Sequence, residues 1–120
     1  MMIKKDYLSH LDTVVIDKAM VSQLEKKYDC VFPERIAQVI SRATDTIFFE
    51  DDSRMLSFSE MLDAENDLHT EFVKLALLPL ADCGENDFIV FHVKDGTYSV
   101  FNIIEECDFK RKDSLEALLK

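Results

Sequence analysis

Helical periodicity marks the amino-terminal part of the chain. Between Ile16 and Tyr28 the apolar residues recur at helical spacing, and Asp17 is placed to cap the helix that this pattern predicts. Pro33 has the fixed φ that suits a first helical turn, so a second helix should run from Pro33 to Ala43. We expect the two helices to form a hairpin, with Phe32 packed back onto the second one.

The middle of the chain combines two short strands with a third helix. Thr46–Phe49 and Met55–Phe58 are rich in β-branched, aromatic and apolar residues and flank an acidic tip, which predicts a small strand pair. Ser57 and Glu60 have the spacing of a capping box, so a helix should begin there. Its apolar stripe continues to about Lys74, across a polar run that is a candidate break.

The carboxy-terminal half predicts a β-hairpin. Phe88–Val93 and Thr97–Ile103 flank the dipeptide Asp95-Gly96, which is typical of two-residue turns, so Lys94 should face Thr97. Both faces of these strands are largely apolar. The strands should therefore lie in the middle of a sheet that is covered on two sides, or that is covered by helices on one side and by a partner or an additional layer on the other.

Two further elements complete the predicted fold. Leu77–Ala81 contains Pro79, which cannot donate to a central ladder, so this segment should be an edge strand. The residues from Asp113 to Glu116 repeat the capping-box spacing and predict a last short helix, Leu115–Leu119. This order of elements predicts an α+β domain with a mainly antiparallel sheet and flanking helices.

Length and composition favour one folded domain that spans residues 1–120. A chain of 120 residues, 48% of them apolar, can bury an ordinary core without a disulfide or a metal. Its two glycines are too few for a phosphate-binding loop or a dinucleotide fingerprint. Cys30, Cys83 and Cys107 form no redox or metal-binding pair, so we expect three reduced and mostly packed thiols.

Charge is the most informative property of the composition. The chain carries 24 acidic and 14 basic residues, a net charge of -10, which argues against nucleic acid and anionic membranes as partners and favours a basic protein. Residues 45–71 hold nine acids against Arg54 alone. No apolar stretch is long enough for a membrane span, and charged residues interrupt any secretory signal, so we expect a cytoplasmic location.

No enzymatic motif emerges from the sequence. His10, His69 and His92 lie in unrelated settings, and no nucleophile motif surrounds a serine or cysteine. We expect His92 to be a hydrogen-bonded strand residue and the acids around His69 to form a solvated face. Asp82–Asp87 has the residue types of a calcium loop but not its frame, so a turn is expected. We therefore assign no catalytic, cofactor-binding or metal-binding residues.

Four segments of the chain resemble the SUKH superfamily and together span most of its length. The third is the most specific, because a proline-containing strand, an acidic glycine turn and an apolar strand follow one another there. The four segments are Gln23–Glu34, Leu56–Met61, Leu78–Ile89 and Asp113–Leu119. The family includes fungal regulators of cell-wall assembly and bacterial immunity proteins that neutralise polymorphic toxins. The resemblance implies a SUKH-like α+β domain that binds a protein and catalyses no reaction.

The acidic residues are the candidate contact surface. Toxin nucleases tend to be basic because they bind phosphate, so an acidic inhibitor gains fast association by electrostatic steering. The expected contact residues are Glu50, Asp51, Asp52, Asp63, Glu65 and Asp67, followed by Asp82, Glu85 and Asp87. Two other hypotheses for the function stay open: a regulatory or scaffolding module without a toxin partner, and a small enzyme or ligand-binding domain. The acidic residues could alternatively serve only to keep the protein soluble.

Overall fold

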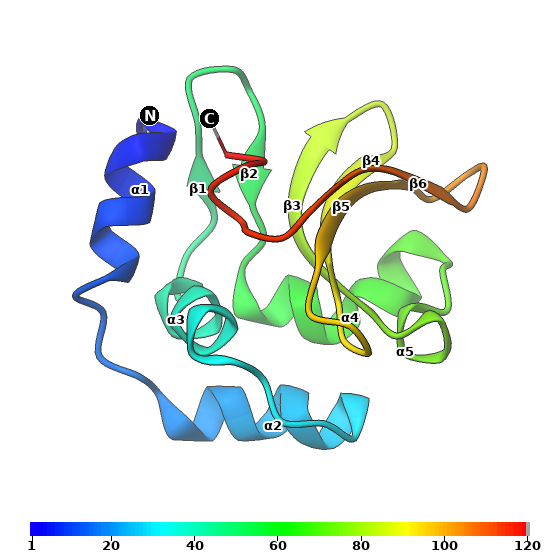
Figure 1. Cartoon of the computed structure of the whole chain (residues 1–120), viewed down its shortest axis with the longest axis horizontal. Coiled ribbons are helices and arrows are strands. Elements are labelled where there is room, and N and C mark those ends of the chain that lie inside the picture. The colour runs from blue at the N-terminus through cyan, green and yellow to red at the C-terminus, as the bar shows by residue number, and fades with distance from the viewer. Residues whose placement is uncertain (120) are drawn as a thin grey trace.

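The structure, a computed structural model, describes residues 1–119 as an α+β domain with a six-stranded antiparallel sheet, which confirms the predicted fold class (Figure 1). None of the helices in this range is long and apolar enough to cross a membrane. The helices are α1 (Lys4–Leu11), α2 (Lys18–Tyr28), α3 (Glu34–Arg42), α4 (Phe58–Leu68) and α5 (Phe72–Leu75). The strands are β1 (Ile47–Phe48), β2 (Arg54–Met55), β3 (Leu77–Gly84), β4 (Asp87–His92), β5 (Tyr98–Asn102) and β6 (Cys107–Lys112).

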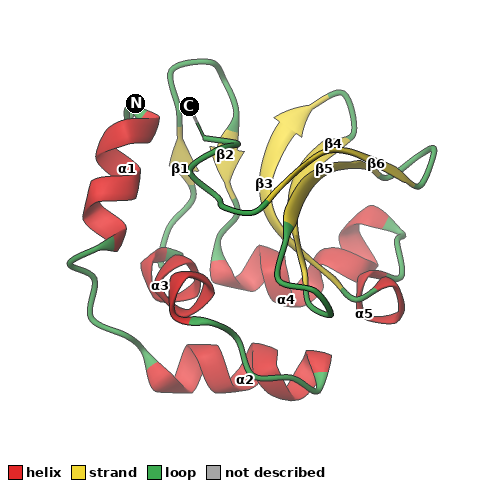
Figure 2. Cartoon of the chain, viewed as in Figure 1, coloured by secondary structure: helices red, strands yellow, loops and turns green. Residues whose placement is uncertain are grey.

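The sheet is a meander in which each strand pairs with its neighbours in sequence, and the helices lie beside and below it (Figure 2). On one face, the ring of Phe91 lies 6.3 Å from that of Phe32, which precedes α3. On the other face, the ring of Phe101 lies 6.5 Å from that of Phe72 in α5. The central strands are therefore covered on both sides, as the sequence predicts.

The β4–β5 hairpin has a longer turn than the sequence predicts. Phe91 pairs with Tyr98, and the N–H of His92 donates to the carbonyl of Thr97, so four residues rather than two form the loop. Gly96 has a positive φ of 75° and Asp95 does not; the Asp95 side chain accepts hydrogen bonds from the N–H and the hydroxyl of Thr97. The shift is two residues, which leaves every side chain on its predicted face.

The prediction that the proline-containing strand lies at an edge is wrong. β3 lies between β2 and β4 in the sheet. β2 spans only two residues and pairs with Ala81 and Asp82, so Pro79 lies beyond the end of β2. The missing N–H of Pro79 is tolerated there, next to a register shift in the β3–β4 pairing.

The predicted amino-terminal helices form with only small differences at their ends. The side chain of Asp17 accepts a hydrogen bond from the Met20 N–H and caps α2, while Pro33 precedes the first residue of α3. The predicted third helix is divided into α4 and α5. His69 has a left-handed backbone (φ 53°) at the end of α4, so the polar run does break the helix.

The carboxy-terminal helix predicted over 115–119 is wrong. The N–H groups of Leu118 and Leu119 both donate to the carbonyl of Leu115, which makes a single turn and no helix. Leu115 and Leu119 are buried. The two leucine side chains therefore anchor this segment to the core, although the segment is not helical.

Helix α1, which the sequence does not predict, fixes the position of the β1–β2 hairpin. The ring of Tyr7 packs edge-to-face against Phe49, with centroids 5.6 Å apart, and both side chains are buried. The backbone N–H of Met2 donates to the carbonyl of Phe48 at 2.9 Å. These contacts join the start of the chain to the strand that leads into the acidic β1–β2 turn.

Candidate functional site

Acidic residues gather at one end of the sheet because of its antiparallel order. The β1–β2, β3–β4 and β5–β6 turns must lie at the same end of a meander, and Figure 1 shows them along its upper rim. We call this region the acidic end; its residues are Glu50, Asp51, Asp52, Glu85, Glu105 and Glu106. The sequence prediction includes the first four of these residues and misses Glu105 and Glu106.

Asp51 serves to hold the β1–β2 turn in place. Its carboxylate lies 2.6 Å from Lys4 Nζ and accepts hydrogen bonds from the backbone N–H and hydroxyl of Ser53. These partners hold the pKa of Asp51 well below its usual range. Asp51 is itself 54% exposed, but its carboxylate is already engaged by Lys4 and Ser53. The other acids of the acidic end are exposed too, and a partner can reach them.

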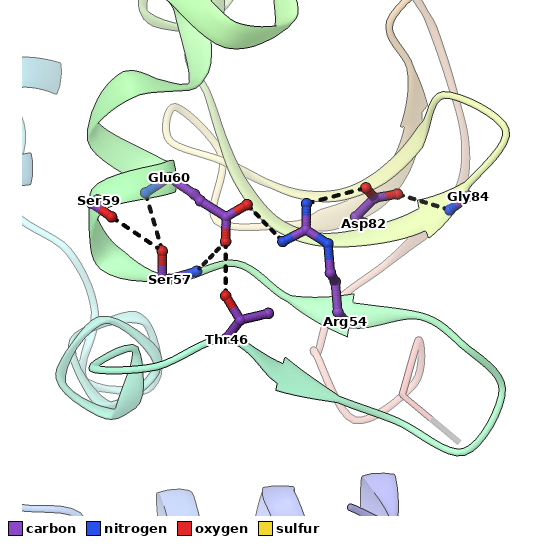
Figure 3. A network of polar contacts seen from close by, with 7 residues as sticks. All are labelled: Thr46, Arg54, Ser57, Ser59, Glu60, Asp82 and Gly84. Carbon is purple, nitrogen blue, oxygen red and sulfur yellow. Dashed lines mark hydrogen bonds and ion pairs between the residues drawn. The ribbon is translucent and has the colours of Figure 1, made fainter. Parts of the chain in front are cut away.

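Asp82 belongs to a network that joins β2, β3 and α4 (Figure 3). The guanidinium of Arg54 donates to Glu60 at 2.6 Å and to Asp82 at 3.4 Å. Asp82 also accepts from the N–H of Gly84 at 2.9 Å. Because both carboxylates are half-buried and share one cation, the network is a structural tie rather than a free contact site.

Glu60 also closes the capping box that the sequence predicts at the start of α4. The N–H of Glu60 donates to the hydroxyl of Ser57 at 3.3 Å, and the Ser57 N–H donates to the Glu60 carboxylate at 3.0 Å. Thr46 donates to the same carboxylate at 3.2 Å. Both carboxylate oxygens of Glu60 are thus engaged within the fold.

Replacing Ser57 with alanine should lower the free energy of unfolding by about 1 kcal/mol, because an N–H of the first turn of α4 loses its acceptor. Urea denaturation measures the change. The matched control is Ser59→Ala, whose exposed hydroxyl lies 3.3 Å from that of Ser57 but is not the acceptor of the Glu60 N–H, so its effect should be much smaller. Equal losses in the two variants would contradict the cap.

Glu85 and Asp87 have different environments although they flank the same turn. Glu85 and Asn86 both have positive φ (54° and 68°), so they form the tight β3–β4 turn, and Glu85 is exposed. Asp87 is half-buried and accepts a hydrogen bond from the Asn102 side chain at 2.9 Å. The turn expected within Asp82–Asp87 is therefore present but shorter, because only Glu85 and Asn86 lie outside the strands, and Glu85 is its outward-facing acid.

The three predicted contact residues of α4 lie apart from the acidic end, below the sheet in Figure 1. Glu65 lies 3.6 Å from Lys27 Nζ and accepts from the backbone N–H of Val73, which ties α4 to α2 and α5. Asp63 and Asp67 are exposed. The nine predicted residues therefore divide into an acidic end, a half-buried set and a helical set, and do not form one surface.

His92 lies in a polar cluster between β4, β5 and β6. Its Nε2 is 2.7 Å from the Ser99 hydroxyl, and its Nδ1 is 3.3 Å from the guanidinium of Arg111. Burial and the charge of Arg111 lower the pKa of His92 and outweigh the carboxylates of Asp108 and Asp95, which raise it, so the neutral ring is favoured. Since a guanidinium only donates, Nδ1 accepts from Arg111, which leaves the proton of the neutral ring on Nε2, facing both the Ser99 hydroxyl and the Asp108 carboxylate, 3.6 Å away.

This arrangement of hydrogen-bond donor and acceptor is the reverse of the one that activates a serine nucleophile. A catalytic histidine accepts the serine proton and carries a carboxylate at its other nitrogen. Here the other nitrogen faces a cation, and Ser99 is fully buried. His92 is thus a hydrogen-bonded strand histidine, as predicted, and it links β4 to the edge strand β6.

The cysteines and potential metal ligands are scattered over the fold. Within residues 1–119, no three histidine, cysteine or acidic side chains converge as metal ligands would. Cys30 is half-buried, and burial raises the pKa of its thiol. Cys83 and Cys107 are exposed, so the expectation of mostly packed thiols is wrong for these two residues, which lie near turns at the acidic end.

Comparisons of the chain with protein-family models, with curated proteins and with solved structures give no match. The functional argument therefore depends on the chemistry and geometry of the chain itself.

Proposed function

We propose that this chain is a noncatalytic protein-binding module of the SUKH immunity type, which binds and neutralises a basic toxin domain through its acidic end. The observation that carries the proposal is the gathering of exposed carboxylates on three adjacent turns of one sheet. Glu50, Asp52 and Glu85 contribute to it, together with Glu105 and Glu106. The resemblance of the sequence to SUKH immunity proteins points to the same class of partner.

The geometry suits recognition by a rigid surface. Tight turns and the α1 contacts hold the backbone of the acidic end, so little conformational entropy is lost when a partner binds. Carboxylates on neighbouring turns make this end of the sheet rich in negative charge, which favours encounter with a basic protein. The hydrogen bonds of His92 support the noncatalytic part of the proposal. Because Nδ1 accepts from Arg111, the Nε2 atom beside Ser99 carries the ring proton and cannot act as a base toward the Ser99 hydroxyl.

Neutralising the exposed acids of the β1–β2 turn should slow association with a basic partner. The double variant Glu50→Gln/Asp52→Asn should bind the basic protein encoded by a neighbouring gene with an association rate constant about three- to fivefold lower at low salt. The difference should shrink as salt is added, because exposed charges are screened. Stopped-flow mixing of the two purified proteins measures the rates.

The matched control is Asp63→Asn/Asp67→Asn on α4. Both double variants change the net charge from -10 to -8, so they differ only in where the charge is removed. The proposal expects the α4 variant to associate nearly as fast as the wild type. Equal slowing by both would show that only net charge matters, and unchanged rates in both would remove the acidic end from the interface.

A further inference from the structure

Exposed apolar side chains gather beside the acidic end. Phe48 is 53% exposed and Ile3 is 48% exposed, and both line a shallow surface hollow of about 850 Å³ between the start of the chain and β1. Met1, also exposed, lines the same hollow. Exposed apolar groups that cluster in this way mark interaction surfaces more often than isolated ones do.

The outward orientation of Phe48 follows from the alternation of side chains along the strand, and the core does not include this side chain. Ile47 and Phe49, its neighbours in sequence, point inward and are buried, so Phe48 must point outward. The hydrogen bond between the Met2 N–H and the Phe48 carbonyl holds the Ile3 segment beside it. Two apolar side chains from separate segments are thus fixed at one side of the hollow without contributing to the core.

The charge around the hollow is complementary to a basic partner. Its ionisable lining consists of the acids Asp6, Asp45 and Glu50 and the basic residues Arg42 and His10, and Glu50 belongs to the acidic end as well. A hollow lined by both apolar and acidic side chains has the composition of a binding hot spot, in which an anchor side chain is buried and charges surround it. The occupant that fits is an apolar or aromatic side chain carried on a basic surface.

We infer that this hollow receives an aromatic or aliphatic anchor residue from the basic partner. The inference rests on the proposed function and assigns different steps of binding to the acidic end and to the hollow. The acidic end sets the rate of encounter, and the hollow sets how long the complex lasts.

Two synthetic peptides test the inference without the natural partner. One is a lysine heptapeptide with tryptophan at its centre, and the other has serine at that position. At low salt the tryptophan peptide should bind the full chain with a Kd about fivefold lower, because part of the indole ring is buried in the hollow. Shifts of the backbone amide signals of Ile3 and Phe48 in NMR titrations measure both affinities.

Three variants show where on the protein the affinity difference between the two peptides arises. Phe48→Ser and Ile3→Ser should each abolish the difference between the peptides; Ile3 is the N-cap of α1, where serine is a favoured residue, so that helix is preserved. Val31→Ser removes an apolar residue that is 88% exposed and lies outside the hollow, between α2 and α3, so the difference should persist in this control.

The outcomes separate the inference from the function on which it rests. Equal affinities of the two peptides for the wild type, or a preference for tryptophan that survives in Phe48→Ser and Ile3→Ser, would overturn the anchor site alone. If neither peptide bound at low salt, both the anchor site and the preference for a basic partner would be overturned.

Discussion

Replacing Phe49 with alanine should lower the free energy of unfolding by about 3–4 kcal/mol, as truncation of a fully buried aromatic residue does. Phe49 is fully buried, packs edge-to-face against Tyr7, and has Lys4 Nζ 5.8 Å from its ring centroid. The alanine variant loses all three interactions and leaves a cavity between α1 and the β1–β2 hairpin. Chemical denaturation followed by circular dichroism measures the loss.

The neighbouring phenylalanine provides the control. Phe48→Ala removes the same type of side chain from the exposed position that directly precedes Phe49, so its cost should stay below about 1 kcal/mol. The two variants therefore differ in burial and not in composition. Comparable losses would mean that Phe49 does not anchor α1, and that the position of the β1–β2 turn has another cause.

Local patterns in the sequence are sufficient to predict the helix caps and the strands with a regular alternation of side chains. The caps at Asp17 and Ser57 depend on residues within one turn, and both occur in the structure. The alternation along β4 and β5 also predicts which side chains face each way. That pattern is insensitive to an error of two residues in register, and this is why it is correct although the predicted turn is wrong.

The elements that the sequence did not reveal lack such a period. All six residues of β6 are exposed, so no alternation of apolar and polar residues marks it as a strand. Helix α1 buries only Tyr7 and Leu11, which is too little for a visible stripe. Because β6 was not predicted, Glu105 and Glu106 could not be placed on a turn beside Glu85.

The division of the acidic residues into exposed and engaged sets depends on contacts between distant parts of the chain. Lys4 and Asp51 are 47 positions apart, and Arg54 and Asp82 are 28 positions apart. No spacing rule predicts such pairs. Composition could show that the chain is acidic, but only the fold shows that Asp51 and Asp82 are held by cations while Glu50, Asp52 and Glu85 are exposed.

The network around Arg54 carries the second large effect. Arg54→Met should lower the free energy of unfolding by about 2 kcal/mol at pH 7, because Glu60 and Asp82 then lose the cation between them. Breaking a fully buried pair costs about 3–5 kcal/mol, and the partial exposure of this network, with the Arg54 side chain 26% exposed, reduces the figure. Methionine keeps the unbranched apolar stem, so packing changes little.

Arg111→Met is the matched control, since Arg111 also lies between two carboxylates, those of Asp95 and Asp108, at 2.9 and 3.1 Å. Its side chain is 46% exposed, and water already solvates all three charges. The free energy of unfolding should therefore be almost unchanged in this variant. A loss as large as that in Arg54→Met would mean that burial does not determine the value of these ion pairs.

The effect of Arg54→Met should also depend on pH. Burial disfavours the ionised form of Glu60, but the Ser57 N–H and the Arg54 guanidinium outweigh it and hold the pKa of Glu60 below its usual value. A carboxyl whose pKa is lowered by folding stabilises the protein above its unfolded pKa, about 4.3, and this contribution is lost as the pH falls through the folded pKa. The gap between wild type and Arg54→Met should therefore be constant above about pH 6 and close as the pH falls from about 5 to about 3. Urea titrations of both proteins across this range measure the gap, and a gap that stayed constant would show that Arg54 acts through packing and not through the charge of Glu60.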